Sequence, residues 1–234
     1  MTRSGAGAGQ VRRVGQSGVG VILPEDWWTI PLADEEARRQ AVTALVNHQF
    51  GHADAHPGLE RQIRDELLSS ADRAAQAGGW LMAIMLTQAG PMPLPATLTA
   101  YRVAGSFADA EGLRRVQEPM TKSLPAGGRL DAGEGPFGMV LRAVRERPGP
   151  VALGGQDVPV LLCDYWSDPA DGQGLSNLSF SPSLVQLRDG LIDLFDAIAG
   201  TLYLVDYDSP DDDWPDDDTS DRDTPGDPAV ADST

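Results

Sequence analysis

The stretch GGWLMAIML, residues 78–86, marks the point at which the sequence changes its hydrophobic period. Before Gly79, apolar residues recur every three or four positions, which is typical of amphipathic helices. After Gly79, short apolar and β-branched runs are separated by Gly and Pro, which is typical of a sheet. The predicted strands are 80–86, 96–103, 137–144, 158–165 and 175–180.

Two helices are predicted upstream of this point. Asp34 is a good N-cap, and the two glutamates that follow it place negative charge in the first turn, where it opposes the helix dipole. The first helix should run to about His48. The second has an apolar stripe that starts at Leu59 and repeats at helical spacing until Gly78 ends it. We expect the two helices to form an antiparallel pair.

The remaining elements complete the fold class. Residues 18–23 form a predicted strand that Pro24 stops, and a short helix is predicted within 107–120. The stretch 184–202 has the best helical stripe in the chain, and Gly190 weakens it by about 1 kcal/mol relative to Ala. This order favours an α+β fold with a largely antiparallel, twisted sheet flanked by helices, an N-terminal helix pair and a long C-terminal helix.

The chain ends in an acidic segment. Residues 206–234 hold 12 of the 35 acidic residues and one base, Arg222, so they bury too little apolar surface to become ordered. The tail carries −11 of the formal net charge of −17, which leaves −6 for residues 1–205. This balance argues against binding to nucleic acid or an anionic membrane. We expect one domain, 18–205, between a flexible segment, 1–17, and a disordered tail.

Cys163 is the single cysteine and lies in an apolar run, so we expect a reduced, buried thiol in preference to a reactive nucleophile. Residues 1–18 lack the apolar run of a secretory signal. The longest apolar run, 80–86, is too short to span a bilayer. These features predict a cytoplasmic protein.

The three histidines, His48, His52 and His56, fall at i, i+4 and i+8. On an unbroken helix their imidazoles would line one face and could bind zinc or a similar metal. Gly51 and Pro57 favour the other interpretation, a helix end followed by a turn. A metal site therefore remains the less favoured alternative, and we predict no cofactor.

Aromatic residues supply the candidate contact sites. Trp27 and Trp28 are adjacent, so in an extended segment one can pack in the core while the other is exposed at a sheet edge, where it could bind a partner. Trp214 lies among the aspartates of the tail, which either solubilises the protein or docks on a basic partner. Residues 163–166 either line a ligand pocket or alternate as ordinary strand residues.

Three short motifs resemble a known family. These are VGVILPEDWWTIPL at 19–32, LSNLSF at 175–180 followed by Ser-Pro, and LFDAIAGTL at 194–202. The chain is similar there to PsbP-like proteins, including the LpqN-type proteins of actinobacteria. The resemblance implies a twisted antiparallel sheet with helices on its faces. It also implies a noncatalytic binding, chaperone or assembly role, and it brings no catalytic residues.

The functional prediction is a noncatalytic cytoplasmic protein-interaction module, an adaptor or a chaperone for another protein. The expected partner is a protein with a basic surface, with no nucleic acid and no membrane, and the oligomeric state stays open. The alternative is a metal-dependent hydrolase that uses the cluster of His48, His52 and His56. Composition and motifs favour the first because no catalytic constellation is recognisable in the sequence.

Overall fold

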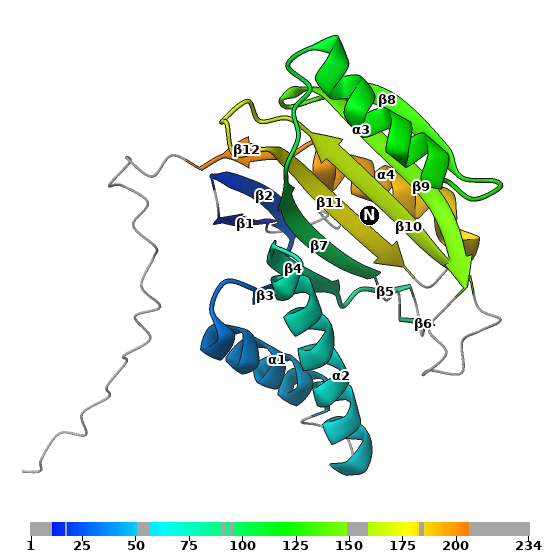
Figure 1. Cartoon of the computed structure of the whole chain (residues 1–234). Helices are drawn as coiled ribbons and strands as arrows, with labels where there is room; N and C mark the ends of the chain where they lie inside the picture. The colour runs from blue at the N-terminus through cyan, green and yellow to red at the C-terminus, as the bar shows by residue number, and fades with distance from the viewer. Residues whose placement is uncertain are drawn as a thin grey trace, which may run out of the picture.

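The computed structural model describes residues 11–16, 18–50, 57–89, 92–93, 96–148, 159–182 and 185–205. Its centre is a seven-stranded sheet in which every pair of neighbouring strands is antiparallel. Helix α4 covers one face, and a helix pair lies in front of the other (Figure 1). This architecture confirms the predicted α+β fold class.

The strand order in the large sheet is β3-β4-β7-β11-β10-β9-β8. The five predicted strands correspond to β4, β7, β9, β10 and β11, whereas the two edge strands were not predicted. The bounds are β3 (Trp27–Pro31), β4 (Gly79–Met85), β7 (Ala96–Val103), β11 (Leu175–Pro182), β10 (Pro159–Ser167), β9 (Gly138–Pro148) and β8 (Arg129–Gly135).

A small sheet includes residues 11–16, which belong to the segment predicted to be flexible, and the rest of that segment lies outside the described residues. Within this sheet, β1 (Val11–Gln16) pairs with β2 (Val19–Pro24), which also pairs with β12 (Tyr203–Leu204). A Cβ at Gly20 would lie 2.3 Å from the ring of Tyr203, so the glycine allows β12 to approach. Residues 11–16 form a strand because they pair with β2 in a local hairpin, which their Gly- and Arg-rich composition does not reveal. A two-stranded hairpin of β5 (Gln88–Ala89) and β6 (Met92–Pro93) completes the strands.

The two helices of the N-terminal pair begin where the sequence predicts them. The backbone N–H of Ala37 donates to the Asp34 carboxylate (2.6 Å), which confirms the N-cap. The predicted C-terminal helix is shorter than expected, because its first turn is a 3-10 helix and it ends before Gly200. The bounds are α1 (Glu35–Phe50), α2 (Pro57–Gln76), α3 (Ala110–Ser123), η2 (Val185–Leu187) and α4 (Arg188–Ala199).

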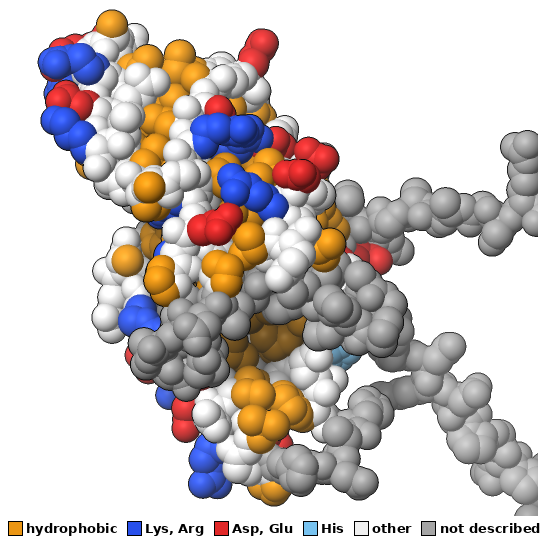
Figure 2. Space-filling model, turned by 90° about the vertical axis from the view of Figure 1, so that its right-hand side faces the viewer, with side chains coloured by type: hydrophobic (Ala, Val, Ile, Leu, Met, Phe, Trp, Pro, Cys, Tyr) orange, Lys and Arg blue, Asp and Glu red, His pale blue; other side chains and the backbone are white. Residues whose placement is uncertain are grey.

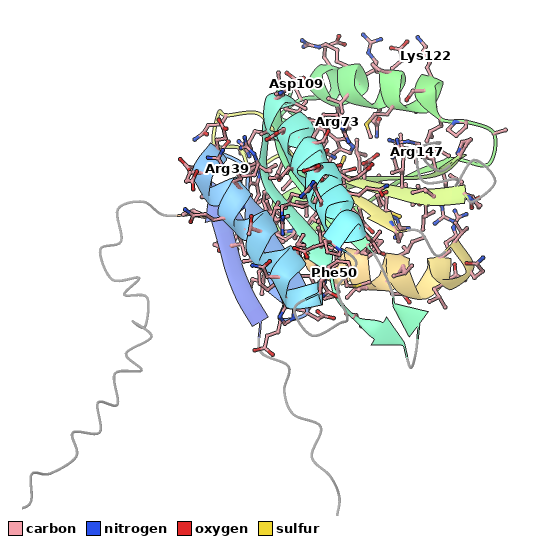
Figure 3. All side chains as sticks on the ribbon, turned by 90° about the horizontal axis from the view of Figure 1, so that it is seen from below. Arg39, Phe50, Arg73, Asp109, Lys122 and Arg147 are labelled. Atoms are coloured by element: carbon pink, nitrogen blue, oxygen red, sulfur yellow. The ribbon has the colours of Figure 1, made fainter. Side chains whose placement is uncertain are left out.

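The helix pair packs on the β3–β4 side of the sheet and encloses its own core. Ile30 and Met82 from the strands meet Val42 and Leu45 from α1 there, and α1 contacts both α2 and β3. Arg38 is buried in this layer: its Nε binds Asp72 of α2 (2.8 Å), and its Nη1 donates to a backbone carbonyl oxygen (2.7 Å). Helix α3, between Asp109 and Lys122, has no buried residue and lies at the outside of the molecule (Figure 3).

An aromatic cluster holds α4 on the opposite face. The ring of Phe180, in the central strand β11, stacks on Phe195 of α4 with centroids 4.3 Å apart. Trp27 and Tyr165 meet Phe180 edge-on, at 6.2 and 5.6 Å. These rings join β3, β10, β11 and α4, and they lie at the centre of the larger core.

We expect Phe195→Ala to lower the free energy of unfolding by about 3–5 kcal/mol, because it removes a fully buried ring and leaves a cavity. Chemical denaturation measures the loss. Leu59→Ala, at an exposed leucine of α2, is the control and should change stability by less than about 0.5 kcal/mol. Equal effects of the two substitutions would contradict a central role for the ring stack.

Candidate functional site

A surface groove of about 700 Å³ lies between the end of the β3–β4 pair and the start of α4. One wall comes from the β3–β4 end, with Asp26, Met85 and Thr87, and the other comes from η2 and the first two turns of α4. Figure 2 shows one side of the molecule, on which hydrophobic side chains are exposed at several places among charged ones. The groove is large enough to hold several side chains of a bound peptide.

The α4 wall is an apolar stripe. Leu187, Leu191 and Leu194 stand at i, i+4 and i+7, the spacing of one helix face. Leu191 is buried against the sheet, whereas Leu187 is 43% exposed. The same stripe therefore starts as an open surface and ends as core.

Gly190 lies on the same wall. A Cβ built on it would meet no heavy atom within 4 Å, and its backbone is not in the left-handed region. Neither crowding nor conformation requires a glycine there, although it costs about 1 kcal/mol relative to Ala in a helix. Its effect in this structure is to leave free space in the groove.

The opposite wall carries two buried polar atoms without a hydrogen-bond partner, Asp26 Oδ1 and Thr87 Oγ1. The backbone of this wall is closed by a hydrogen bond in which the N–H of Leu86 donates to the carbonyl oxygen of Asp26 (2.7 Å). On α4, Arg188 already donates from Nη1 to Glu146 of β9 (3.0 Å). The groove thus combines apolar walls with two unsatisfied oxygen atoms.

A smaller cavity, about 280 Å³, lies near the other end of α4, beside β8 and β9. The guanidinium of Arg142 binds Asp196 of α4 and Asp131 of β8, the latter at 3.2 Å from Nη2. Tyr165 donates its hydroxyl to Asp196 (2.7 Å). Burial lowers the pKa of Arg142, but its bonds to the two carboxylates outweigh burial and raise that pKa overall. Arg142, Asp131, Asp196 and Tyr165 therefore bond to one another, and the carboxylate of Glu134 also lines the cavity.

Neither Cys163 nor Tyr165 is suited to act as a nucleophile or base. Burial, followed by the neighbouring Asp164 charge, raises the pKa of the Cys163 thiol to about 12. Burial and the hydrogen bond to Asp196 also raise the pKa of Tyr165. Residues 163–166 alternate between the two faces of β10, as ordinary strand residues do, and Tyr165 is the one that reaches a cavity.

The two adjacent tryptophans point to opposite faces of β3, as an extended segment requires. Neither ring is fully exposed, because Trp27 packs in the larger core and Trp28 packs against the helix pair, and the contact role of either tryptophan stays a prediction. Trp27 is 2% exposed and packs on Phe180. Trp28 is half-buried, donates from Nε1 to the carbonyl oxygen of Ala41 (3.2 Å) and stacks on His48. A partner could reach part of Trp28 but none of Trp27 without rearrangement.

The metal hypothesis falls largely outside the described residues, because His52 and His56 are not among them. His48 is exposed at the end of α1, and its ring stacks on Trp28 with centroids 5.5 Å apart. Within the described part of the chain, no three His, Cys, Asp or Glu side chains come together as a metal site would require. Trp214 also lies outside the described residues, so its contact role stays a prediction.

The groove residues were not identified from the sequence. Leu187 and Leu191 belong to the stripe that predicts the final helix, and nothing in that pattern indicates which of them is exposed. The available signal was Gly190, which weakens the helix without ending it. None of the helices in the described ranges is long and apolar enough to cross a membrane.

Comparison with known proteins yields one structural match. The solution structure of cyanobacterial PsbP (CyanoP) from Synechocystis sp. PCC 6803 aligns with 88% of this chain and 98% of its own, at 10% identity and a TM-score of 0.43. It is a protein of the kind that the sequence resembles, at a similarity too low to carry an argument about this chain. No protein-family model and no curated protein matches the sequence.

We expect the Cys163 thiol to resist modification in the native protein, because a thiol with a raised pKa stays protonated at neutral pH and this one is fully buried. Titration with a chromogenic disulfide reagent at pH 7 should detect no thiol before denaturant is added and one thiol per chain afterwards. Rapid stoichiometric reaction of the folded protein would show that the thiol is accessible.

We expect Gly190→Ala to raise the free energy of unfolding by about 0.5–1 kcal/mol, because alanine favours the helix and its methyl group enters open space. Chemical denaturation measures the change. Gly58→Ala, in the first turn of α2, also places its methyl group in open space. It is the matched control for the effect of helix propensity at a position outside the groove. A loss of stability in Gly190→Ala alone would mean that the groove is closed in solution.

Proposed function

We propose that this protein is a noncatalytic protein-interaction module that binds a segment of another protein in the groove at the start of α4. The observation that carries the proposal is a groove of about 700 Å³ with an apolar helix face on one wall, on which Leu187 is exposed. Apolar grooves of this kind are the usual sites for peptide segments.

The chemistry of the other candidate sites supports binding in preference to catalysis. In the polar cavity the carboxylates of Asp131 and Asp196 are both engaged by Arg142, and the Cys163 thiol is protonated at neutral pH. No general base therefore stands beside a free nucleophile in that cavity. We also propose that the protein acts as an adaptor or chaperone and that it is located in the cytoplasm. The specific resemblance to LpqN-type proteins is part of the same proposal.

The proposal is tested by placing the photo-crosslinking residue p-benzoylphenylalanine at position 187, and in a second variant at position 59. Both positions hold exposed leucines, at 43% and 46%, but Leu59 lies on α2, away from the groove. We expect illumination in native lysate to yield a discrete crosslinked protein from position 187 that is missing from position 59. Mass spectrometry of the product identifies the partner and the contacted segment.

A groove-filling variant makes the test specific. Gly190→Trp in the position-187 background should abolish the crosslink, because the indole would occupy the open space beside residue 190. Circular dichroism confirms that the variant is folded. Identical products from both positions, or a crosslink that survives groove filling, would contradict the proposal.

The metal-dependent alternative is tested separately by elemental analysis of untagged protein. Stoichiometric zinc, manganese, nickel or iron that is lost when His48, His52 and His56 are replaced by Ala would favour the hydrolase. Binding at the groove predicts no change of the position-187 crosslink in that variant, because none of the three histidines lines the groove.

A further inference from the structure

We infer that helix α3 is a lid, which opens without unfolding of the rest of the domain and uncovers a second apolar surface of the large sheet. The inference does not rest on the groove, because α3 lies on the face of the sheet opposite α4 (Figure 1, Figure 3). It rests on which residues α3 covers and on how α3 is attached to them.

The surface under α3 is identified by the alternation of side chains along β9. Arg142 binds Asp196 of α4, so its side chain lies on the α4 face of the sheet. Its neighbours Leu141 and Ala143 therefore point to the opposite face, where α3 lies in front of β8 and β9 (Figure 1). Leu141 is fully buried and Ala143 is 2% exposed, yet neither belongs to the core against α4 or to the core of the helix pair. Helix α3 is thus the element that covers them.

The same surface continues into the two neighbouring strands. Trp166 of β10 pairs in register with Leu141, so it lies on the same face, and it is partly buried. Leu175, at the start of β11, is fully buried and also lies outside both cores. A Cβ built on Gly105 would lie 3.0 Å from the side chain of Leu175 and 3.5 Å from that of Val116, which places α3 against this end of the sheet.

In the described part of the chain, apolar contacts alone attach α3 to this surface. Every hydrogen bond and ion pair of an α3 side chain there has its partner within the helix, such as Glu111 with Arg114 (2.8 Å) and Glu118 with Lys122 (2.6 Å). No residue of α3 is buried, whereas α1, α2 and α4 each bury residues. The helix therefore lies on the sheet without a polar bond to it.

The apolar contacts come from one stripe of α3. Leu113, Val116 and Met120 stand at i, i+3 and i+7, and each is partly buried. The free energy of burial scales with the apolar area removed from water, so this stripe holds α3 less strongly than the fully buried Phe195 and its neighbours hold α4. Segments with few buried apolar contacts open locally at a lower free energy than the whole domain.

The two ends of α3 permit this motion. Asp168 fixes the loop before the helix, because it accepts from Ser106 Oγ (2.7 Å) and from the backbone N–H of Phe107 (2.6 Å). A cavity of about 440 Å³ beside this loop leaves room for the helix to move. After the helix, Gly127 has a φ of +85°, a conformation that favours glycine. Residues 108–127 can therefore rotate about their ends while the strands stay paired.

Thiol labelling of the full chain tests the lid. We expect Leu141→Cys to react with a chromogenic disulfide reagent on the order of 100-fold faster than Cys163 in the same molecule, because Cys163 is buried on the α4 face and reacts only after global unfolding. The rate at position 141 should change little at low denaturant concentration, since local opening exposes little surface. Peptide mapping by mass spectrometry assigns the label to each thiol.

The matched control is Ile30→Cys. Ile30 is also a fully buried strand residue, but it lies under the helix pair, where Trp28 Nε1 donates to the carbonyl oxygen of Ala41 (3.2 Å). We expect this thiol to react at the rate of Cys163. Equal rates at positions 141 and 163 would overturn the lid, and so would equally fast labelling at positions 141 and 30, because the whole fold would then be loose.

Two further substitutions in the Leu141→Cys background separate opening of the lid from global unfolding. Phe195→Ala should accelerate labelling of Cys163 by more than about 100-fold and change that at position 141 by less than about two-fold, because the ring stack stays intact when α3 opens. Val116→Ala should accelerate labelling at position 141 by about four-fold, because it removes apolar contact that only the closed lid makes. Thr121→Ala, on the exposed face of α3, should have no such effect. Acceleration at position 141 by Phe195→Ala equal to that at Cys163 would overturn the inference.

Should Leu141→Cys fail to fold, hydrogen exchange of the parent chain decides. Helices α3 and α4 have similar lengths, 14 and 12 residues. We expect the amides of α3 to be on the order of 100-fold less protected than those of α4, and Phe195→Ala to lower the protection of α4 alone. Equal protection of the two helices, or an equal loss of protection in Phe195→Ala, would show that α3 opens only with the whole domain and would overturn the lid.

Discussion

The stack of Phe180 on Phe195 is the interaction on which the candidate site depends. It fixes α4 to the central strand of the sheet, and the edge-on contacts of Trp27 and Tyr165 bring β3 and β10 to the same point. Both cavities use α4 as a wall, the groove at its start and the polar cavity near its end. Their shapes are consequences of one packing arrangement, and loosening it would alter the two together.

Rigid packing on the other side of β3 fixes the wall opposite α4. Trp28 and the helix pair cover that face, and Arg38 links α1 to α2 through Asp72. The β3–β4 ladder ends at the backbone bond between Leu86 and Asp26, which closes this wall of the groove. A wall held by main-chain bonds loses little conformational entropy on binding.

The spacing of hydrophobic residues along the sequence was sufficient to predict the central strands and the helix pair, because burial of one or two faces of an element imposes that spacing. It failed at the edges: β8 reads RLDAGEG and has too few apolar residues to resemble a strand, although pairing with β9 makes it one. The groove was not predictable either. Whether Leu187 is covered depends on the β3–β4 end, about a hundred residues away in the chain, and Trp27 is buried against Phe180 of β11, which is also distant in the chain.

Two residues that lower the stability of the fold, Gly190 and Asp26, lie on facing walls of this groove. Alanine would be more stable than Gly190 in a helix, and a paired or apolar side chain would be more stable than the buried, unsatisfied oxygen of Asp26. Each departure alone has an ordinary explanation, since exposed glycines and isolated unpaired atoms occur in many folds. Their position around one groove that also exposes Leu187 is different, because a bound segment would cover that leucine. Natural proteins concentrate such departures where they bind, and that coincidence is why we place the interaction site at the start of α4.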